Sequence, residues 1–434
     1  MILSLMLAVV LVFIAGAQTP DPSTLPLVQQ TDLVMKGSFT VPYDLTYGGE
    51  AIAFNPAGPS LFLGVNGGIA EVTIPAFDTR ATLKQPLNWF PYTLMPLIGP
   101  QTGDRLGGLL VKDGLIGSLY YSFDTANSQE RSHFKHSLTL TATPGTLSQV
   151  GAAKQSGFTA GFMTLIPVEH QARLGGDALT GQCCISIITR TSSGPAAFAF
   201  TASKIGEPVV AAQPLLYYPA DHATLGSWTS LAPNPVFNMS TLVNGMAIIP
   251  GTNTLIYVGS TGLGKSCYGP GTGDLSLVGT VPSYGGEPYC YDPTFYGKAP
   301  HSYPYAYYAW LYNLNDLAAV KAGTKQPWDV TPYATFPLEL GGVVRGQSKL
   351  SVTVNPLTRD LYLAQYNGEP DCCGGGFPKI HVIGVTVGTT PTTINCTVQS
   401  VSAYADKDAR LTVRCNTNGK PLIPKGTAFT VTVK

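Results

Sequence analysis

The chain has 434 residues and equal numbers of basic and acidic side chains, 25 of each, so its formal net charge is zero. Charged residues make up only 12% of the chain, whereas Gly (48) and Pro (35) together account for about a fifth. This balance excludes an intrinsically disordered protein, which combines low hydrophobicity with high net charge. It also excludes a nucleic-acid binder, which carries an excess of basic residues, and a helical bundle, which tolerates little Gly or Pro. We therefore expect an all-β protein with many turns.

The first 17 residues, MILSLMLAVVLVFIAGA, form an unbroken apolar run that ends in Ala15-Gly16-Ala17. Small residues at this place are typical of the cleavage site of a secretory signal peptide. The alternative is an uncleaved membrane anchor, but a bilayer-spanning helix needs about 20 residues. We therefore expect a signal peptide over residues 1–17 and a secreted, extracellular protein with no membrane span after its removal.

A degenerate repeat follows, in which each unit has four apolar strands joined by turns that contain Gly or Pro. The five units open with the strands 33–42, 90–97, 162–168, 227–233 and 334–340. The glycines near the second strands are Gly49, Gly108, Gly176, Gly245 and Gly346, which lie 59, 68, 69 and 101 residues apart. Four-stranded units repeated in this way are typical of the blades of a β-propeller. We expect a propeller of about five blades (six possible) over residues 18–388, with two or three β-sandwich domains as the alternative.

The fourth unit carries an insertion, residues 261–307, and residues 284–312 hold nine Tyr in 29 positions. An exposed Tyr offers an apolar face with a polar tip and suits contact with sugar rings or with a protein partner. The alternative is a loop that packs over the propeller face through its own aromatic side chains. The candidate ligand-binding residues are Tyr284, Tyr289, Tyr291, Tyr296, His301 and Tyr303, together with Arg105 and Arg345 from neighbouring turns.

Gly259–Ser266, within this region, matches the nucleotide-binding pattern G-x-x-x-x-G-K-[ST]. A phosphate-binding loop needs a helix directly after it, because the helix N-terminus holds the phosphates. The residues that follow, CYGPGTG (267–273), cannot form a helix, so we expect a loop without nucleotide here. The chain also lacks the histidine spacings of zinc sites and the carboxylate spacing of a calcium loop, so we expect no metal and no other cofactor.

The connections that lead into the second strands, and those between the third and fourth strands, share one face of a propeller. The insertion and the loop 368–377 would therefore lie on the same face, beside several of the few charged residues. A glycosidase needs two carboxylates that flank the scissile bond. The catalytic candidates are Glu50, Asp104, Glu169 and Asp177, and the alternative is that they are ordinary turn residues with solvated tips.

Eight cysteines fit an oxidising compartment. The economical local disulfides are Cys267–Cys290 and Cys396–Cys415, whereas the pairing of Cys183, Cys184, Cys372 and Cys373 stays open. Asn238 and Asn395 match the acceptor pattern for N-glycosylation.

One helix is expected over residues 313–323, between a capping Asn and a terminal Gly, as a link from blade four to blade five. Beyond the Thr/Pro linker that starts at residue 389, residues 389–434 are expected to form a small β appendage of three strands. Such a short segment needs a staple, which Cys396–Cys415 would supply.

The repeat units, above all GGEAIAFNPAGPSLFL (48–63), resemble those of secreted β-propeller repeat proteins of unassigned function. The resemblance covers roughly residues 33–387 and implies the fold, but it carries over no functional residue, because propellers have many unrelated functions.

Three functions fit these observations. The preferred one is a secreted β-propeller that binds a glycan, a surface polymer or an extracellular protein, and neither nucleic acid nor a membrane. The second is a carbohydrate-active enzyme, a glycoside hydrolase or a lyase, with its site at the propeller face. The third is a structural, self-assembling surface protein whose terminal strand AFTVTV (428–433) pairs with a neighbour. The residues leave open whether the chain is an enzyme.

Overall fold

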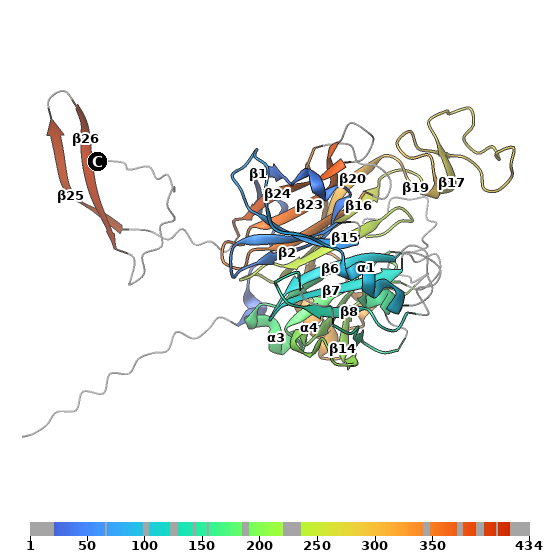
Figure 1. Ribbon diagram of the computed structural model, residues 1–434, viewed down its shortest axis with the longest axis horizontal. Coiled ribbons are helices and arrows are strands. Elements are labelled where there is room, and N and C mark those ends of the chain that lie inside the picture. The colour runs from blue at the N-terminus through green and yellow to red at the C-terminus, as the bar shows by residue number, and fades with distance from the viewer. Residues whose placement is uncertain are drawn as a thin grey trace, which may run out of the picture. The chain divides into compact units, whose positions relative to one another are not determined.

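The computed structural model describes residues 21–65, 67–98, 104–121, 129–141, 145–153, 156–184, 191–219, 236–341, 348–370, 376–387, 395–404 and 407–416. The chain divides into two compact units, Met1–Val387 and Gly388–Lys434. The first unit is mostly β (Figure 1). The expected signal peptide lies outside the described residues. In the described part of the chain, no helix is long and apolar enough to cross a membrane.

Five antiparallel sheets make up most of the first unit. The first holds β2 (Gly48–Asn55), β3 (Ser60–Val65), β4 (Gly68–Thr73) and β5 (Leu83–Asn88), and the second holds β6 (Asp104–Val111), β7 (Leu115–Tyr121) and β8 (His133–His136). The third holds β10 (Met163–Leu165), β11 (Ala178–Thr180), β12 (Ala197–Phe200) and β14 (Ala212–Leu216). The fourth holds β15 (Leu242–Ile248), β16 (Thr254–Gly262), β20 (Tyr305–Asn313) and β21 (Ala334–Pro337). The fifth holds β22 (Leu350–Val354), β23 (Leu361–Pro370), β24 (Gly376–Val385) and β1 (Leu33–Thr40).

The first-named strand of each sheet packs against the first-named strand of the next. β2 contacts β6, β6 contacts β10, β10 contacts β15, β15 contacts β22, and β22 contacts β2 again. Successive side chains of a strand point to opposite faces. Each of these strands can therefore place side chains in two different hydrophobic cores. On β2, Ala51 packs with Leu109 of the second sheet, whereas Ile52 packs with Tyr362 of the fifth.

These strands approach one another so closely that only glycine fits at the contact points. A Cβ atom on Gly108 would lie 2.4 Å from the carbonyl oxygen of Gly161, and one on Gly245 would lie 2.5 Å from the backbone nitrogen of Val352. The glycine spacing of the sequence therefore has a packing cause at Gly108 and Gly245. Gly176, by contrast, precedes β11, the second strand of its sheet.

The first strand of the chain completes the last sheet. β1 pairs with β24, with Leu33 opposite Val385, and β21 likewise pairs with β20 of the fourth sheet. The sequence pattern assigns the expected strand 33–42 to the first unit, but it belongs to the fifth sheet, and it assigns the expected strand 334–340 to the fifth unit, but that strand belongs to the fourth sheet. Strand patterns mark a strand but not the sheet it joins, so the expected units are shifted by one strand.

Two of the expected strands are wrong over most of their length. Residues 90–97 form α1 (Phe90–Leu94) and the 3-10 helix η4 (Met95–Ile98). Their buried residues are Phe90, Pro91, Leu94, Met95 and Ile98, which is a helical spacing. The expected strand 162–168 is the short β10 followed by α3 (Val168–Leu174). The expected strand 227–233 lies outside the described residues.

The predicted helix at residues 313–323 is confirmed as α4 (Leu314–Lys321). The side chain of Asn313 accepts a hydrogen bond from the backbone N–H of Asn315, and Gly323 has a φ of 76° just after the helix. Because β21 pairs with β20, α4 joins two strands of one sheet rather than two sheets. The other short elements are η1 (Pro22–Thr24), η2 (Gln30–Asp32), η3 (Tyr43–Leu45), β9 (Gln149–Val150), α2 (Ser156–Thr159), η7 (Ala202–Lys204), β13 (Val209–Val210) and η8 (Pro327–Asp329).

The second unit contains a hairpin of β25 (Asn395–Tyr404) and β26 (Lys407–Asn416). The register places Cys396 opposite Cys415, the two cysteines of the predicted staple. The third expected strand of the appendage lies outside the described residues.

Candidate functional site

Between β16 and β20 the chain leaves the fourth sheet and forms an excursion, residues 263–304, that projects from it (Figure 1). It contains a small sheet of its own, in which β17 (Cys267–Thr272) pairs with β18 (Cys290–Tyr291) and β19 (Lys298–His301). The predicted disulfide Cys267–Cys290 is confirmed and ties β17 to β18. β17 follows the segment Gly259–Ser266 at once, so the helix that a phosphate-binding loop requires is absent there.

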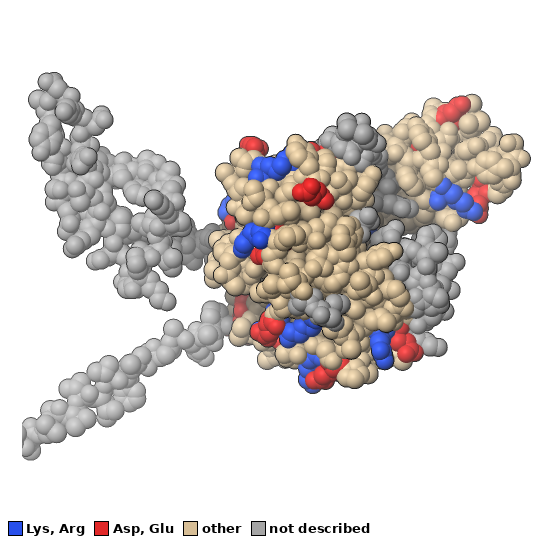
Figure 2. Space-filling view, viewed as in Figure 1, with Lys and Arg blue, Asp and Glu red and all other residues tan. Residues whose placement is uncertain are grey.

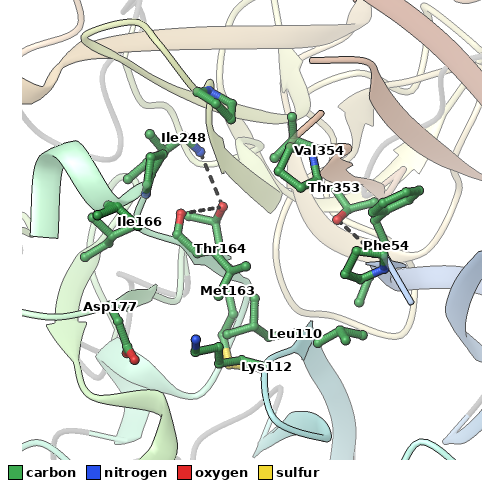
Figure 3. Close-up of a pocket in the computed structure, with 18 of the residues that line it drawn as sticks. Phe54, Leu110, Lys112, Met163, Thr164, Ile166, Asp177, Ile248, Thr353 and Val354 are labelled. Carbon is green, nitrogen blue, oxygen red and sulfur yellow. Dashed lines mark hydrogen bonds between the residues drawn. The ribbon is translucent and has the colours of Figure 1, made fainter. Parts of the chain in front are cut away.

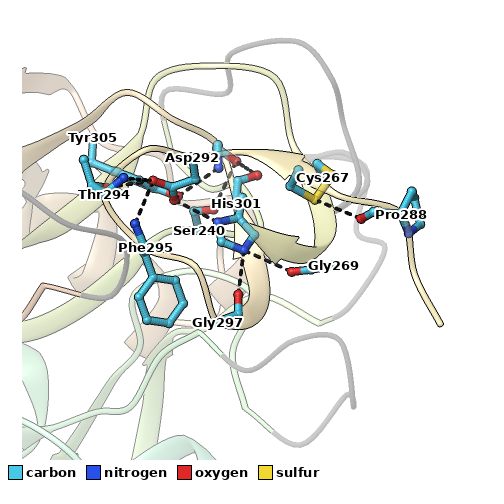
Figure 4. Close-up of polar contacts among 12 residues, drawn as sticks. Ser240, Cys267, Gly269, Pro288, Asp292, Thr294, Phe295, Gly297, His301 and Tyr305 are labelled. Carbon is cyan, nitrogen blue, oxygen red and sulfur yellow. Dashed lines mark hydrogen bonds and ion pairs between the residues drawn. A yellow bond between two sulfur atoms is a disulfide. The ribbon is translucent and has the colours of Figure 1, made fainter. Parts of the chain in front are cut away.

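A buried carboxylate, Asp292, organises the base of the excursion (Figure 4). Its Oδ2 accepts hydrogen bonds from the Tyr305 hydroxyl at 2.6 Å and from His301 Nδ1 at 2.8 Å. Its Oδ1 accepts from the backbone N–H and hydroxyl of Thr294 at 2.9 and 2.7 Å. Burial raises the pKa of Asp292, but the hydrogen bonds from Tyr305, His301 and Thr294 outweigh it, so that the pKa lies below its ordinary value.

His301 is an internal cross-link of the excursion. Its Nε2 lies 3.0 Å from the carbonyl oxygens of both Gly269 and Gly297, while its Nδ1 faces Asp292. Both ring nitrogens face oxygen atoms, so the ring links Asp292 to the two backbone carbonyls. His301 is only 1% exposed. The sequence hypothesis placed His301 among ligand-binding residues; the structure places it beneath the surface, where it positions the loop.

The five candidate tyrosines of the excursion differ in exposure. Tyr284, Tyr291 and Tyr296 are 77%, 39% and 65% exposed. Tyr289 and Tyr303 are half-buried, and Tyr303 packs edge-on against Tyr291, with ring centres 5.6 Å apart. The excursion therefore presents three tyrosine rings to solvent.

Aliphatic side chains are exposed beside these rings. Leu275, Leu277, Val278 and Val281 are 39–71% exposed. Charged groups on the excursion are few, and Lys298 and Glu287 form an ion pair of 2.6 Å with each other (Figure 2). The excursion therefore exposes aliphatic as well as aromatic side chains.

The structure describes three of the four candidate carboxylates, of which Glu169 and Asp177 line one cavity and Glu50 does not. Glu50, near the start of β2, is buried, and its Oε2 lies 3.0 Å from Lys349 Nζ. Glu169 lies on α3 and Asp177 lies just before β11. Both line a cavity at the C-terminal end of β10. Each has one oxygen occupied by a backbone N–H, that of Gly251 or Ala202.

The remaining candidates lie outside what the structure describes. These are the side chains of Asp104, Arg105, Cys396, Cys415 and Asn395, and the whole of Arg345, Cys372 and Cys373. Cys183 and Cys184 form a disulfide with each other. Asn238 is buried, and its Nδ2 donates to the carbonyl of Gly262 at 2.7 Å, so the folded chain does not offer it for glycosylation. Among the described residues, no three His, Cys, Asp or Glu side chains are grouped to hold a metal ion.

Sequence reasoning overlooked Lys112, which lines the same cavity as Glu169 and Asp177. The cavity lies where the first-named strands of all five sheets end (Figure 3). No local motif marks it, because its residues come from segments spread between residues 53 and 356.

Comparisons with known proteins add little to this geometry. No protein-family model matches the chain, and no curated protein matches it. Among solved structures, the chain is similar to a luciferin-regenerating enzyme, with 9% sequence identity over 77% of this chain and 80% of that chain. The TM-score is 0.33. A likeness at this level assigns neither a fold family nor an activity to this chain.

Proposed function

We propose that residues 33–387 form a five-bladed β-propeller, closed by β1. The support is the series of contacts among the first-named strands, which leads from β2 through β6, β10, β15 and β22 back to β2. A strand from the N-terminal part of the chain that completes the last sheet would close such a ring non-covalently. Radial repetition of this kind leaves only short, protected sheet edges.

We further propose that the protein is an extracellular binding module that contacts a polysaccharide through the excursion. The observation that carries this proposal is the exposure of Tyr284, Tyr291 and Tyr296 on a segment that a disulfide and the buried hydrogen bonds of Asp292 hold in shape. Tyrosine rings supply rigid, amphipathic contact area at low entropic cost. The disulfides Cys267–Cys290 and Cys183–Cys184 support an extracellular location, because disulfides are rare in reducing compartments.

A binding assay on immobilised polysaccharides tests the role of these rings. The triple variant Tyr284→Ala, Tyr291→Ala, Tyr296→Ala should bind at least about tenfold more weakly, because a tenfold change is about 1.4 kcal/mol and one anchoring tyrosine contributes about 2 kcal/mol or more. The matched control is Tyr92→Ala, since Tyr92 is 65% exposed on α1 and is not part of the excursion.

Two results would refute the proposal. One is that the parent protein binds none of a broad set of polysaccharides. The other is that the triple variant binds as tightly as Tyr92→Ala. Binding to a protein but to no polysaccharide would keep the excursion as a contact surface and replace the ligand class.

A further inference from the structure

A cavity of about 370 Å³ lies at the end of the first unit where the first-named strands of all five sheets finish (Figure 3). The antiparallel register of β15 and β16 places the excursion at the other end of these strands, since it follows Gly262 and the cavity adjoins Ile248. The volume is in the range of small-molecule sites, which are about 300–1,000 Å³. The cavity is therefore separate from the excursion.

Most of the cavity wall is apolar. Leu110, Met163, Ile166, Ile248 and Val354 line it, and they come from the second to the fifth sheet and the segment after β10. A pocket of this kind favours the apolar body of a ligand, and a few polar groups then fix the ligand's orientation.

Lys112 is the charged lining group that is left without a partner in the part of the chain that the structure describes. Its side chain is half-buried and lines the cavity (Figure 3). The two lining carboxylates differ in this respect. Glu169 accepts a hydrogen bond from the backbone N–H of Gly251 at 3.1 Å. Asp177 accepts one from the backbone N–H of Ala202 at 2.7 Å.

We propose that this cavity binds a small amphiphilic anion, that is, an apolar chain or ring system that carries one carboxylate or sulfonate. The apolar body lies against Met163, Ile248 and Val354, and the acid group pairs with the ammonium of Lys112. A half-buried ammonium that lacks a carboxylate partner favours an anion and disfavours a cation at the same position.

Three ligands of equal chain length separate charge from hydrophobicity: decanoate, decanol and decylammonium. Calorimetric titration of the parent protein, below the micellar concentration of each, should give the highest affinity for decanoate. Lys112→Met should weaken decanoate binding about tenfold or more, because a hydrogen bond to a charged group contributes about 1.5–3 kcal/mol. The same substitution should leave the affinity for decanol unchanged. Lys112→Arg should retain most of the affinity for decanoate.

Lys204→Met is the matched control, because Lys204 is exposed on η7 and does not line the cavity. The triple tyrosine variant of the excursion should bind decanoate as the parent does, which separates this proposal from the polysaccharide proposal. Tighter binding of decylammonium than of decanoate would overturn the proposal. So would undetectable binding of decanoate, or equal binding of decanoate by Lys112→Met and the parent.

Discussion

Two buried histidines should make the stability of this protein depend on pH. His133, on β8, has an exposed fraction of 0%, with Nδ1 2.8 Å from Ser132 Oγ and Nε2 3.0 Å from Thr180 Oγ1. Burial lowers the pKa of His133 to about 3. His381, on β24, is also buried, and burial together with the nearby charge of Lys379 lowers its pKa to about 4.

The size of the effect follows from proton linkage. An unfolded chain protonates its histidines near pH 6.5, whereas His133 and His381 stay neutral in the folded protein down to about pH 4. Below pH 6.5 the unfolded chain therefore binds more protons, and the free energy of unfolding falls as the pH falls. One pKa unit corresponds to about 1.36 kcal/mol, so going from pH 7 to pH 5 should remove about 2 kcal/mol for each histidine.

Urea unfolding at pH 7 and pH 5, followed by circular dichroism, measures this loss. His133→Gln and His381→Gln remove one titrating group each, so each variant should lose about 2 kcal/mol less than the parent between the two pH values. Comparing losses rather than absolute stabilities cancels the cost of the substitution itself. Carboxyl groups such as Asp292, whose pKa is lowered by its hydrogen bonds although burial opposes this, titrate below the window. If both variants lose as much as the parent, the buried histidines do not cause the pH dependence.

Three further outcomes are expected. Gly108→Ala should lower the free energy of unfolding by about 3 kcal/mol, because the new Cβ would lie 2.4 Å from a backbone oxygen. Gly58→Ala should change the free energy of unfolding by less than about 0.5 kcal/mol, because its Cβ would contact only the end of a lysine side chain. Asp292→Asn should open the excursion to limited proteolysis, because Asp292 accepts hydrogen bonds through both side-chain oxygens and Asn has only one. The exposed Asp274→Asn should not have this effect, and equal cleavage of both variants would contradict this role of Asp292. A chain that ends at Val387 should unfold at the same temperature as the first unit does in the 434-residue chain. A clearly lower melting temperature of the shortened chain would show that the second unit stabilises the first.

The sequence predicted the positions of the strands better than the assignment of each strand to a sheet. Short apolar runs between turns correctly mark segments such as Ser60–Val65, which is buried along its whole length, and Leu350–Val354. A local pattern of apolar residues carries no information on which distant strand a segment pairs with. It therefore could not show that Leu33 pairs with Val385. At residues 90–97 the apolar spacing also fits a helix, and Pro91 in the first turn favours one.

The candidate site could be predicted in location but not in the role of each residue. The density of tyrosine alone pointed to the excursion, and Tyr284 and Tyr296 are indeed exposed. The sequence could not separate them from His301, because burial of the imidazole depends on carbonyl groups of Gly269 and Gly297. Lys112 escaped notice for the same reason, since its surroundings come from other sheets.

The excursion differs from the sheets in how it is stabilised, and this bears on its function. Among residues 263–304, all of which the structure describes, the buried hydrophobic residues are Cys290 and Ala299. A segment of this size with so small an apolar core needs other constraints, and the disulfide Cys267–Cys290 and the Asp292 network supply them. Its large apolar side chains are consequently free to face solvent. Exposed apolar side chains on a segment that is tied by a disulfide and not by a core of its own support the proposal that the excursion is a contact surface.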